Sequence, residues 1–495
     1  MKKLAAALCA LCALLCLLAP AALALEITGL ETETVTREWE TSLFFSRMEA
    51  LTGIAVQAHA VYEQEDYDKL LADMEKGSIS ADALFKAGLT REQEIRLIDA
   101  GAIIDLAPLI EENMPNLSAL LEAHPQWREV IALEDGRIAS LPLINESERQ
   151  VIVWINRTWL EALGMDLPQN PGELTQALSA MTGADLNGNG KHDEIAADIM
   201  GVFEMRWLLP YFGIIADDYN LARGEDGSLV FAPELPAYRD FIAMLADWVD
   251  QGILTADAFT GTHSTAALSA SGSDEAVKSG LIISPAPYTS APIDSTLDYE
   301  ALLMPGPDGE TRWRDFLGEI WTGCFAATSA CEDPGEALRW LDALYAPEGA
   351  TLAYAGVEGE DYSVDGEGRW AFITDGVRTV DDIRSESLMY TGSAMPGLTP
   401  TSFLLRVDSE IDVHVLKTDL RVKAVAEQVT LPYALGREAQ ARASELALTL
   451  GRLVDEGIAR FATGEMALTV DHYEAWLSEL REAGSGELVA LFSGC

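Results

Sequence analysis

The sequence predicts an α/β protein of two or more lobes, and three observations support this fold class. Short apolar or β-branched runs alternate with stretches of helical periodicity, as they do in α/β lobes. With 49% hydrophobic and 23% charged residues, the composition is that of a globular chain. The 495 residues exceed what a single hydrophobic core organises, so we expect the chain to divide.

Residues 1–24 have the pattern of a secretory signal peptide. Lys2 and Lys3 precede an apolar run that starts at Leu4, and Ala22 and Ala24 offer small residues for cleavage. The run is too short for a transmembrane helix. We therefore expect export to the cell surface or the extracellular space. A bacterial lipid anchor is not expected, because leucine, not a small residue, precedes each leader cysteine: Cys9, Cys12 and Cys16.

The chain is strongly acidic, with 33 basic and 80 acidic residues. Removal of Lys2 and Lys3 with the leader leaves 31 basic residues and a net charge of −49. This field repels phosphates and anionic lipids, so nucleic acid is excluded as a partner. Of the remaining cysteines, Cys324 and Cys331 fit a disulfide bridge in an oxidising compartment. The odd count and the terminal Cys495 equally fit free thiols.

Regular elements follow one another along the whole chain. Apolar side chains repeat at helical spacing from Tyr238 to Val249, and Gly252 follows as a helix stop. Asp333-Pro334-Gly335-Glu336 has the N-cap and first-turn proline that begin a helix. Further helices are expected at 438–461 and 471–482. The expected strands are Ile54–Val61, Arg149–Asn156, Gly280–Ser284, Tyr299–Met304 and Cys324–Thr328.

Residues 185–194 have the spacing of an EF-hand-type calcium loop. Oxygen-bearing side chains occupy positions 1, 3, 5 and 9, glycine occupies position 6, and position 7 would give its main-chain carbonyl. The usual glutamate at position 12 is replaced by Ala196, so a neighbouring carboxylate would complete the shell. A polar Asn-Gly turn is the alternative interpretation. The predicted structural calcium ligands are Asp185, Asn187, Asn189, Lys191, Asp193 and Glu194.

The sequence contains none of the usual nucleophile, metalloprotease, P-loop or dinucleotide signatures. Acidic pairs are frequent, and a glycosidase needs two carboxylates, but pairs are expected by composition among 80 acidic residues. We therefore expect no catalytic site.

Aromatic residues near loops and element ends are more informative. An indole face can stack on the apolar face of a sugar ring, although such residues also pack in lobe cores. The predicted ligand-binding residues are Trp39, Trp207, Trp321 and Tyr354.

The segment Trp154–Leu174 resembles the strand–helix–"LG…P…EL" signature of bacterial extracellular solute-binding proteins of ABC importers, family 1. Within that family it is similar to the long sugar-binding lipoproteins of Gram-positive bacteria. One element departs from the family pattern, because the strand expected before the first helix is weakly marked at 25–30. Further segments that resemble family motifs are Leu51–Ile54, Leu106–Asn116, Asp135–Pro142, Asp185–Glu194 and Gly356–Tyr362.

This resemblance implies the two-lobed, type II periplasmic-binding-protein-like fold, in which the chain crosses between lobes three times. We expect crossings near 143–148, 305–314 and 355–365. The first lobe would comprise 26–145 and 312–356, and the second 146–311 and 357–495.

The resemblance also implies a function. An oligosaccharide would bind in an interlobe cleft that closes on it, and the transmembrane subunits of an ABC permease would receive it. Two alternatives remain open. One is a secreted carbohydrate-active enzyme that uses an acidic pair. The other is a non-transport sugar sensor or adhesion module that retains the binding fold.

Overall fold

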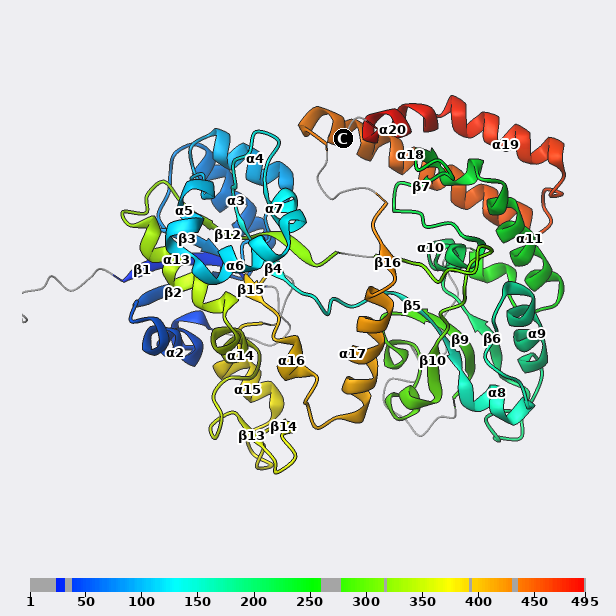
Figure 1. Ribbon diagram of the computed structural model, residues 1–495, viewed down its shortest axis with the longest axis horizontal. Helices are drawn as coiled ribbons and strands as arrows, with labels where there is room; N and C mark the ends of the chain where they lie inside the picture. Colours follow the sequence, from blue (N-terminus) through cyan, green and yellow to red (C-terminus); the bar gives the residue numbers. More distant parts are fainter. Residues whose placement is uncertain are drawn as a thin grey trace, which may run out of the picture. The chain divides into compact units, whose positions relative to one another are not determined.

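The computed structural model describes residues 24–31, 38–259, 277–315, 318–390, 394–429 and 435–493. The chain forms two compact units, whose elements are labelled in Figure 1. Unit 1 comprises Met1–Ile144 and Trp321–Pro400, and unit 2 comprises Asn145–Ile320 and Thr401–Cys495. The expected leader at 1–24 lies outside the described residues apart from Ala24.

Two boundaries between the units differ from the expected lobe boundaries. The chain changes unit after Ile144, Ile320 and Pro400, whereas we expected the last two changes after residues 311 and 356. Residues 312–320 stay in unit 2, where Trp313 is buried and its Nε1 donates to the Val151 carbonyl at 2.9 Å. Residues 357–400 stay in unit 1, because strand Gly397–Leu398 joins the sheet of that unit.

A six-stranded sheet organises unit 1, in the order β15-β4-β12-β3-β1-β2. Strand β1 is parallel to β2 and β3, β12 is antiparallel to β3, and β15 is parallel to β4. The weakly marked segment 25–30 is a full strand that pairs with β2 along its whole length. The strands are β1 (Leu25–Leu30), β2 (Val56–Val61), β3 (Ala83–Phe85), β4 (Leu141–Ile144), β12 (Ile320–Ala327) and β15 (Gly397–Leu398).

Helices bury their apolar faces against this sheet. Leu84 of β3 packs in one cluster with Tyr67, Leu71 and Leu97 from two helices. The expected N-cap is confirmed, since the Asp333 side chain accepts a hydrogen bond from the Glu336 N–H. The helices of unit 1 are α2 (Leu43–Thr52), α3 (Gln64–Glu75), α4 (Arg91–Asp99), α5 (Ala107–Asn113), α6 (Pro115–Ala123), α7 (Pro125–Ile131), α13 (Pro334–Asp342), α14 (Pro347–Ala355) and α15 (Val380–Ser387).

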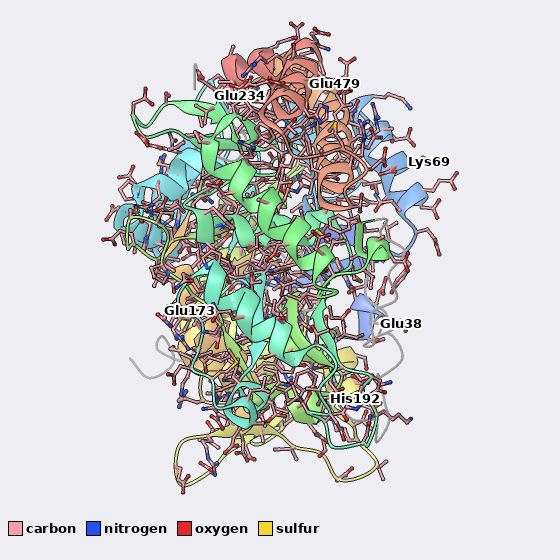
Figure 2. The ribbon with its side chains drawn as sticks, turned by 90° about the vertical axis from the view of Figure 1, so that its right-hand side faces the viewer. Glu38, Lys69, Glu173, His192, Glu234 and Glu479 are labelled. Atoms are coloured by element: carbon pink, nitrogen blue, oxygen red, sulfur yellow. The ribbon has the colours of Figure 1, made fainter. Side chains whose placement is uncertain are left out.

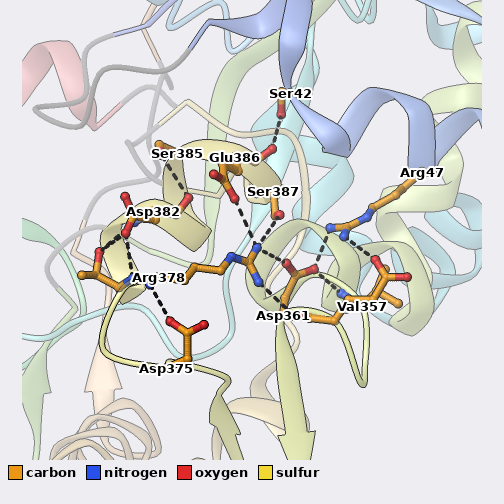
Figure 3. A network of polar contacts seen from close by, with 12 residues as sticks. Ser42, Arg47, Val357, Asp361, Asp375, Arg378, Asp382, Ser385, Glu386 and Ser387 are labelled. Atoms are coloured by element: carbon orange, nitrogen blue, oxygen red, sulfur yellow. Dashed lines mark hydrogen bonds and ion pairs between the residues drawn. The ribbon is translucent and has the colours of Figure 1, made fainter.

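A buried carboxylate joins the hairpin β13 (Tyr362–Val364)–β14 (Trp370–Phe372) to the rest of unit 1 (Figure 3). The Asp361 side chain is fully buried and accepts from Arg47 Nη1 at 2.6 Å, Arg378 Nη2 at 2.8 Å and the Val357 N–H at 2.8 Å. Gly356 has a φ of 82°, and a Cβ there would lie 2.2 Å from Asp361 Oδ2. The Gly356–Tyr362 motif is therefore a structural one.

Unit 2 contains a four-stranded sheet in the order β10-β5-β9-β6, with β6 parallel to β9 and the other pairs antiparallel. Trp154 of β5 is fully buried and its Nε1 donates to the Ser284 carbonyl at 3.0 Å. The strands are β5 (Ile152–Asn156), β6 (Ile195–Asp198), β9 (Ser279–Ser284) and β10 (Tyr299–Ala301). Two-stranded ribbons pair β7 (Leu221–Arg223) with β8 (Leu229–Phe231) and β11 (Trp313–Arg314) with β16 (Ala426–Glu427).

The helices of unit 2 share one apolar core with its sheet. Trp248 and Trp476 both belong to this cluster, so helices far apart in the sequence meet in it. The expected helices 438–461 and 471–482 are confirmed with shifts of one residue. The helices are α8 (Arg157–Leu163), α9 (Pro171–Met181), α10 (Val202–Met205), α11 (Pro236–Asp250), α16 (Thr401–Leu404), α17 (Glu410–Lys423), α18 (Arg437–Ala462), α19 (Val470–Glu482) and α20 (Ser485–Phe492).

Many of the acidic residues lie on the surface. Figure 2 labels Glu173, Glu234 and Glu479, all three exposed on unit 2. Among the described residues, no helix combines the length and the apolar character that crossing a membrane requires.

Candidate functional site

The loop at 185–194 folds its side-chain oxygens onto its own backbone. Asp185 Oδ2 accepts from the Gly190 N–H at 3.1 Å, Asn187 Oδ1 from the Asn189 N–H at 3.0 Å, and Asn189 Oδ1 from the Lys191 N–H at 2.8 Å. Gly188 and Gly190 have φ values of 71° and 77°, the left-handed conformation that lets so short a segment turn twice. The loop therefore has the tight turns of an ion-binding loop.

Two carboxylates close this loop. Glu194 Oε1 accepts from the N–H groups of Leu186 at 2.8 Å and Asn187 at 3.1 Å. Asp193 Oδ1 accepts from Asn189 Nδ2 at 3.0 Å, and this hydrogen bond is the main cause of the lowered pKa of Asp193. Glu194 Oε2 is buried and has no hydrogen-bond partner among the described residues. An oxygen-only donor set with one unpartnered carboxylate oxygen fits a hard cation such as calcium.

The described part of the chain nevertheless shows no preformed cluster of three His, Cys, Asp or Glu side chains that could hold a metal ion. The Asn oxygens and the main-chain carbonyl of Lys191 would have to supply part of the shell. Asp193 Oδ2 also lies 3.8 Å from the Lys278 ammonium, which offsets part of its charge. Calcium binding at this loop therefore stays a prediction.

Two of the four predicted ligand-binding residues lie in cores, contrary to expectation. Trp39 is 1% exposed, and its Nε1 donates to the buried Glu31 carboxylate at 2.9 Å. Its ring packs edge-on against Phe85. Trp207 is also buried, with the Arg314 guanidinium 4.8 Å from its ring centre. Indoles enclosed in this way have little face to offer a sugar.

The other two residues are partly exposed, and both belong to unit 1. Tyr354 of α14 stacks on Tyr390 with ring centres 4.5 Å apart, and its hydroxyl hydrogen-bonds Thr399 Oγ1 at 2.9 Å. Trp321 is the second residue of β12 and is half-buried. These two aromatic residues remain predicted ligand contacts.

Sheet topology places further polar residues at the carboxyl-terminal ends of the parallel strands in unit 1. Glu31 follows β1 and Lys86 follows β3, and Lys86 Nζ donates to Glu31 Oε1 at 3.0 Å although both residues are buried. Lys86 also has a φ of 51°, unusual for a residue other than glycine. Open α/β sheets bind ligands at this end. Sequence reasoning missed both residues, because neither belongs to a motif.

Two buried acidic residues of unit 2, Asp198 and Glu204, have local structural roles. Glu204 accepts from the Met200 N–H at 2.7 Å, and burial raises the pKa of its carboxyl to about 7. Asp198 accepts from Ser279 Oγ at 2.9 Å. At 8% and 2% exposed, these two carboxylates have little access to a substrate.

The cysteines carry no bridge within the described chain. Cys324 and Cys331 are free thiols, so the bridged alternative is wrong. Cys495 lies outside the described residues.

Comparisons with known proteins find similarity to substrate-binding proteins of ABC transporters. It is 27% identical to the fructooligosaccharide ABC transporter substrate-binding protein FusA of Streptococcus pneumoniae over 333 residues, which span 64% of this chain and 60% of FusA. The structure of a FusA EF-hand mutant in complex with fructo-nystose superimposes with a TM-score of 0.68 and 21% identity, covering 95% of this chain and 98% of that one.

An HMO-binding solute-binding protein of Bifidobacterium longum infantis superimposes with a TM-score of 0.77 and 17% identity, covering 95% of this chain and 97% of that one. No protein-family model matches the sequence. The chain is thus homologous to FusA, an ABC transporter substrate-binding protein, and has the type II periplasmic-binding-protein-like α/β fold of the solute-binding proteins of sugar ABC importers.

Proposed function

We propose that this protein is an extracellular solute-binding protein that captures an oligosaccharide and delivers it to an ABC permease. The observation that carries the proposal is the sequence relationship to FusA, a fructooligosaccharide-binding component of such a transporter. The shared fold over 95% of the chain supports it. Because the aligned region spans 60% of FusA, the identity of the sugar is a matter for experiment.

Charge and exposed aromatic residues favour an uncharged sugar as the ligand. A net charge of −49 on the exported chain disfavours polyanionic saccharides. In unit 1, the partly exposed rings of Trp321 and Tyr354 provide apolar surface of the kind that stacks on a sugar ring. Carboxylates and amides are abundant partners for sugar hydroxyls. We therefore expect a neutral oligosaccharide, bound by stacking and hydrogen bonds.

The loop at 185–194 is proposed to bind one structural calcium ion. Its ligands would be the side chains of Asp185, Asn187, Asn189, Asp193 and Glu194 and the carbonyl of Lys191. The unpartnered Glu194 Oε2 and the tight Asx turns support this assignment, as does the description of one FusA structure as an EF-hand mutant. The ion would neutralise the carboxylates and hold the loop closed, without taking part in chemistry.

Export and a permease partner complete the proposal. The leader pattern at 1–24 would direct the chain across the membrane, and transmembrane permease subunits would accept the loaded protein. Coexpression of the chain with its cognate permease in a non-utilising host should allow sugar uptake that a leader deletion abolishes.

The decisive experiment is calorimetry of the exported chain with a panel of neutral oligosaccharides that includes kestose, fructo-nystose, milk oligosaccharides and N-glycan fragments. We expect saturable binding of at least one member with one site per chain. Chromatography should then recover the bound sugar intact. Release of shortened sugars would instead favour the enzyme alternative, and absence of binding across the panel would refute the proposal.

A further inference from the structure

The loop at 185–194 contains two Asn-Gly pairs, Asn187-Gly188 and Asn189-Gly190. An asparagine before glycine is prone to deamidation, because a glycine without a Cβ lets its backbone nitrogen approach the preceding side chain closely. The folded structure decides which pair reacts, since the attacking nitrogen and the side-chain amide must both be available.

Both asparagine side chains lie folded over the glycine that follows. Asn187 Oδ1 accepts from the Asn189 N–H at 3.0 Å, and Asn189 Oδ1 accepts from the Lys191 N–H at 2.8 Å. Each of these Asx turns brings the side-chain carbonyl back across the intervening glycine. A Cβ at Gly188 or Gly190 would meet nothing within 4 Å. The two pairs are therefore matched in turn type and in the open space around the glycine.

The two glycine N–H groups differ in their partners. The Gly190 N–H donates to Asp185 Oδ2 at 3.1 Å, whereas the Gly188 N–H donates to no group among the described residues. A carboxylate that accepts such a bond holds the proton on the nitrogen, and its negative charge opposes formation of the amide anion. Gly188 is exposed to solvent. The available nucleophile is therefore the Gly188 nitrogen.

The two side-chain amides differ in the same direction. Asp193 Oδ1 accepts from Asn189 Nδ2 at 3.0 Å but from Asn187 Nδ2 only at 3.4 Å, a long and weak hydrogen bond. The Asn189 amide is thus held firmly at both its oxygen and its nitrogen. Exposure alone would favour the opposite order, since Asn189 is exposed and Asn187 is half-buried. The order of reaction therefore distinguishes hydrogen bonding from exposure.

We propose that Asn187 is a site of spontaneous deamidation and that Asp185 and Asp193 protect Asn189. The Gly188 nitrogen gives its proton to solvent base and bonds to Asn187 Cγ, while the Cγ–Nδ2 bond breaks and ammonia leaves with a proton from solvent. Water then opens the cyclic imide at either carbonyl, which leaves aspartate or isoaspartate at position 187. Either product adds a negative charge, and isoaspartate also lengthens the backbone within the turn.

The test incubates the whole exported chain in mildly alkaline buffer with a chelator, so that the loop carries no calcium. Peptide mapping by mass spectrometry follows the conversion of amide to acid, and fragment ions assign it to one of the two sites. In the folded chain Asn187 should deamidate about tenfold faster than Asn189, the factor that one hydrogen bond to a charged group contributes. In urea, which removes the turns, the two rates should be similar.

Two variants test the protection of the second pair. Asp185→Ala frees the Gly190 N–H and should raise the rate at Asn189 while that at Asn187 stays unchanged. Asp226→Ala, in the comparable acidic turn between β7 and β8, should leave both rates as in the wild type.

Three outcomes would overturn the inference. These are an absence of deamidation at Asn187 in the folded wild type, an Asn189 rate that equals or exceeds the Asn187 rate, and an equal rise at both sites in Asp185→Ala. None of these measurements involves a sugar or a permease, so each outcome leaves the proposed function intact.

Discussion

At the scale of single residues, Asp361 is the side chain that joins three separate segments of unit 1. Its buried carboxylate accepts hydrogen bonds from two arginines and one backbone N–H. Asp361→Asn should lower the free energy of unfolding by about 2–3 kcal/mol, because an amide meets the arginine donors with a donor of its own. Urea denaturation measures the change, and an unaltered midpoint would refute this role.

Low pH should reduce the difference in unfolding free energy between the wild type and Asp361→Asn. Burial raises the pKa of Asp361, but hydrogen bonds from Val357 and Arg378 outweigh it and leave the pKa below its ordinary value. A carboxyl with a lowered pKa stabilises the fold above the unfolded-state pKa, about 4, and loses that contribution as the pH falls further. Glu367→Gln is the matched control, since the exposed Glu367 side chain lies in the same hairpin and pairs with Arg369 in solvent, so its loss should not change the midpoint.

Residue type and sequence position alone did not distinguish the aromatic residues of the core from those that could contact a ligand. Sequence position made Trp39 and Trp321 equal candidates, because both lie at element ends near loops. Trp39 is enclosed by Phe85 and Glu31, residues that precede or follow it by up to 46 positions. Trp321 is at a strand end and stays partly exposed. Only the packing of distant segments distinguishes the two environments.

At the scale of elements, the loop at 185–194 carries a testable metal prediction. Calcium should raise the Tm of the wild type, because binding only to the folded state adds about 2.7 kcal/mol at a hundredfold excess over Kd. Asp185→Ala should remove this response. Asp226→Ala, which alters a comparable acidic turn between β7 and β8, should retain it. Identical melting curves with calcium and with chelator would contradict the prediction.

Helix α18 contains two glycines that should respond to alanine in opposite ways. A Cβ at Gly451 meets nothing within 4 Å, so Gly451→Ala should stabilise the protein by about 0.5–1 kcal/mol through helix propensity. A Cβ at Gly457 would lie 2.2 Å from Trp476 Nε1, so Gly457→Ala must displace the Trp476 ring of α19 and should destabilise the protein. Urea midpoints measure both, and equal shifts would show that α18 and α19 do not pack this closely.

Elements with strong local signals were predictable. The Asp333 cap, the periodic helix at 236–250 and the strands at 152–156 and 279–284 lie at or within two or three residues of their expected places. Strand β12 begins at Ile320, four residues before the expected start, and lies beside β4 in the sheet. Strand β1 is another such case, since a short segment becomes a full strand once β2 and β3 flank it.

At the scale of the whole molecule, the sequence by itself determined the α/β class, the acidic surface and the resemblance to sugar-importer binding proteins. These follow from composition, periodicity and short motifs, which are local properties. Tertiary structure decided where the chain changes unit, which indoles are buried and which polar atoms lie at the strand ends. Those depend on contacts between residues hundreds of positions apart, such as Arg47 with Asp361, whose pairing energy no local pattern encodes.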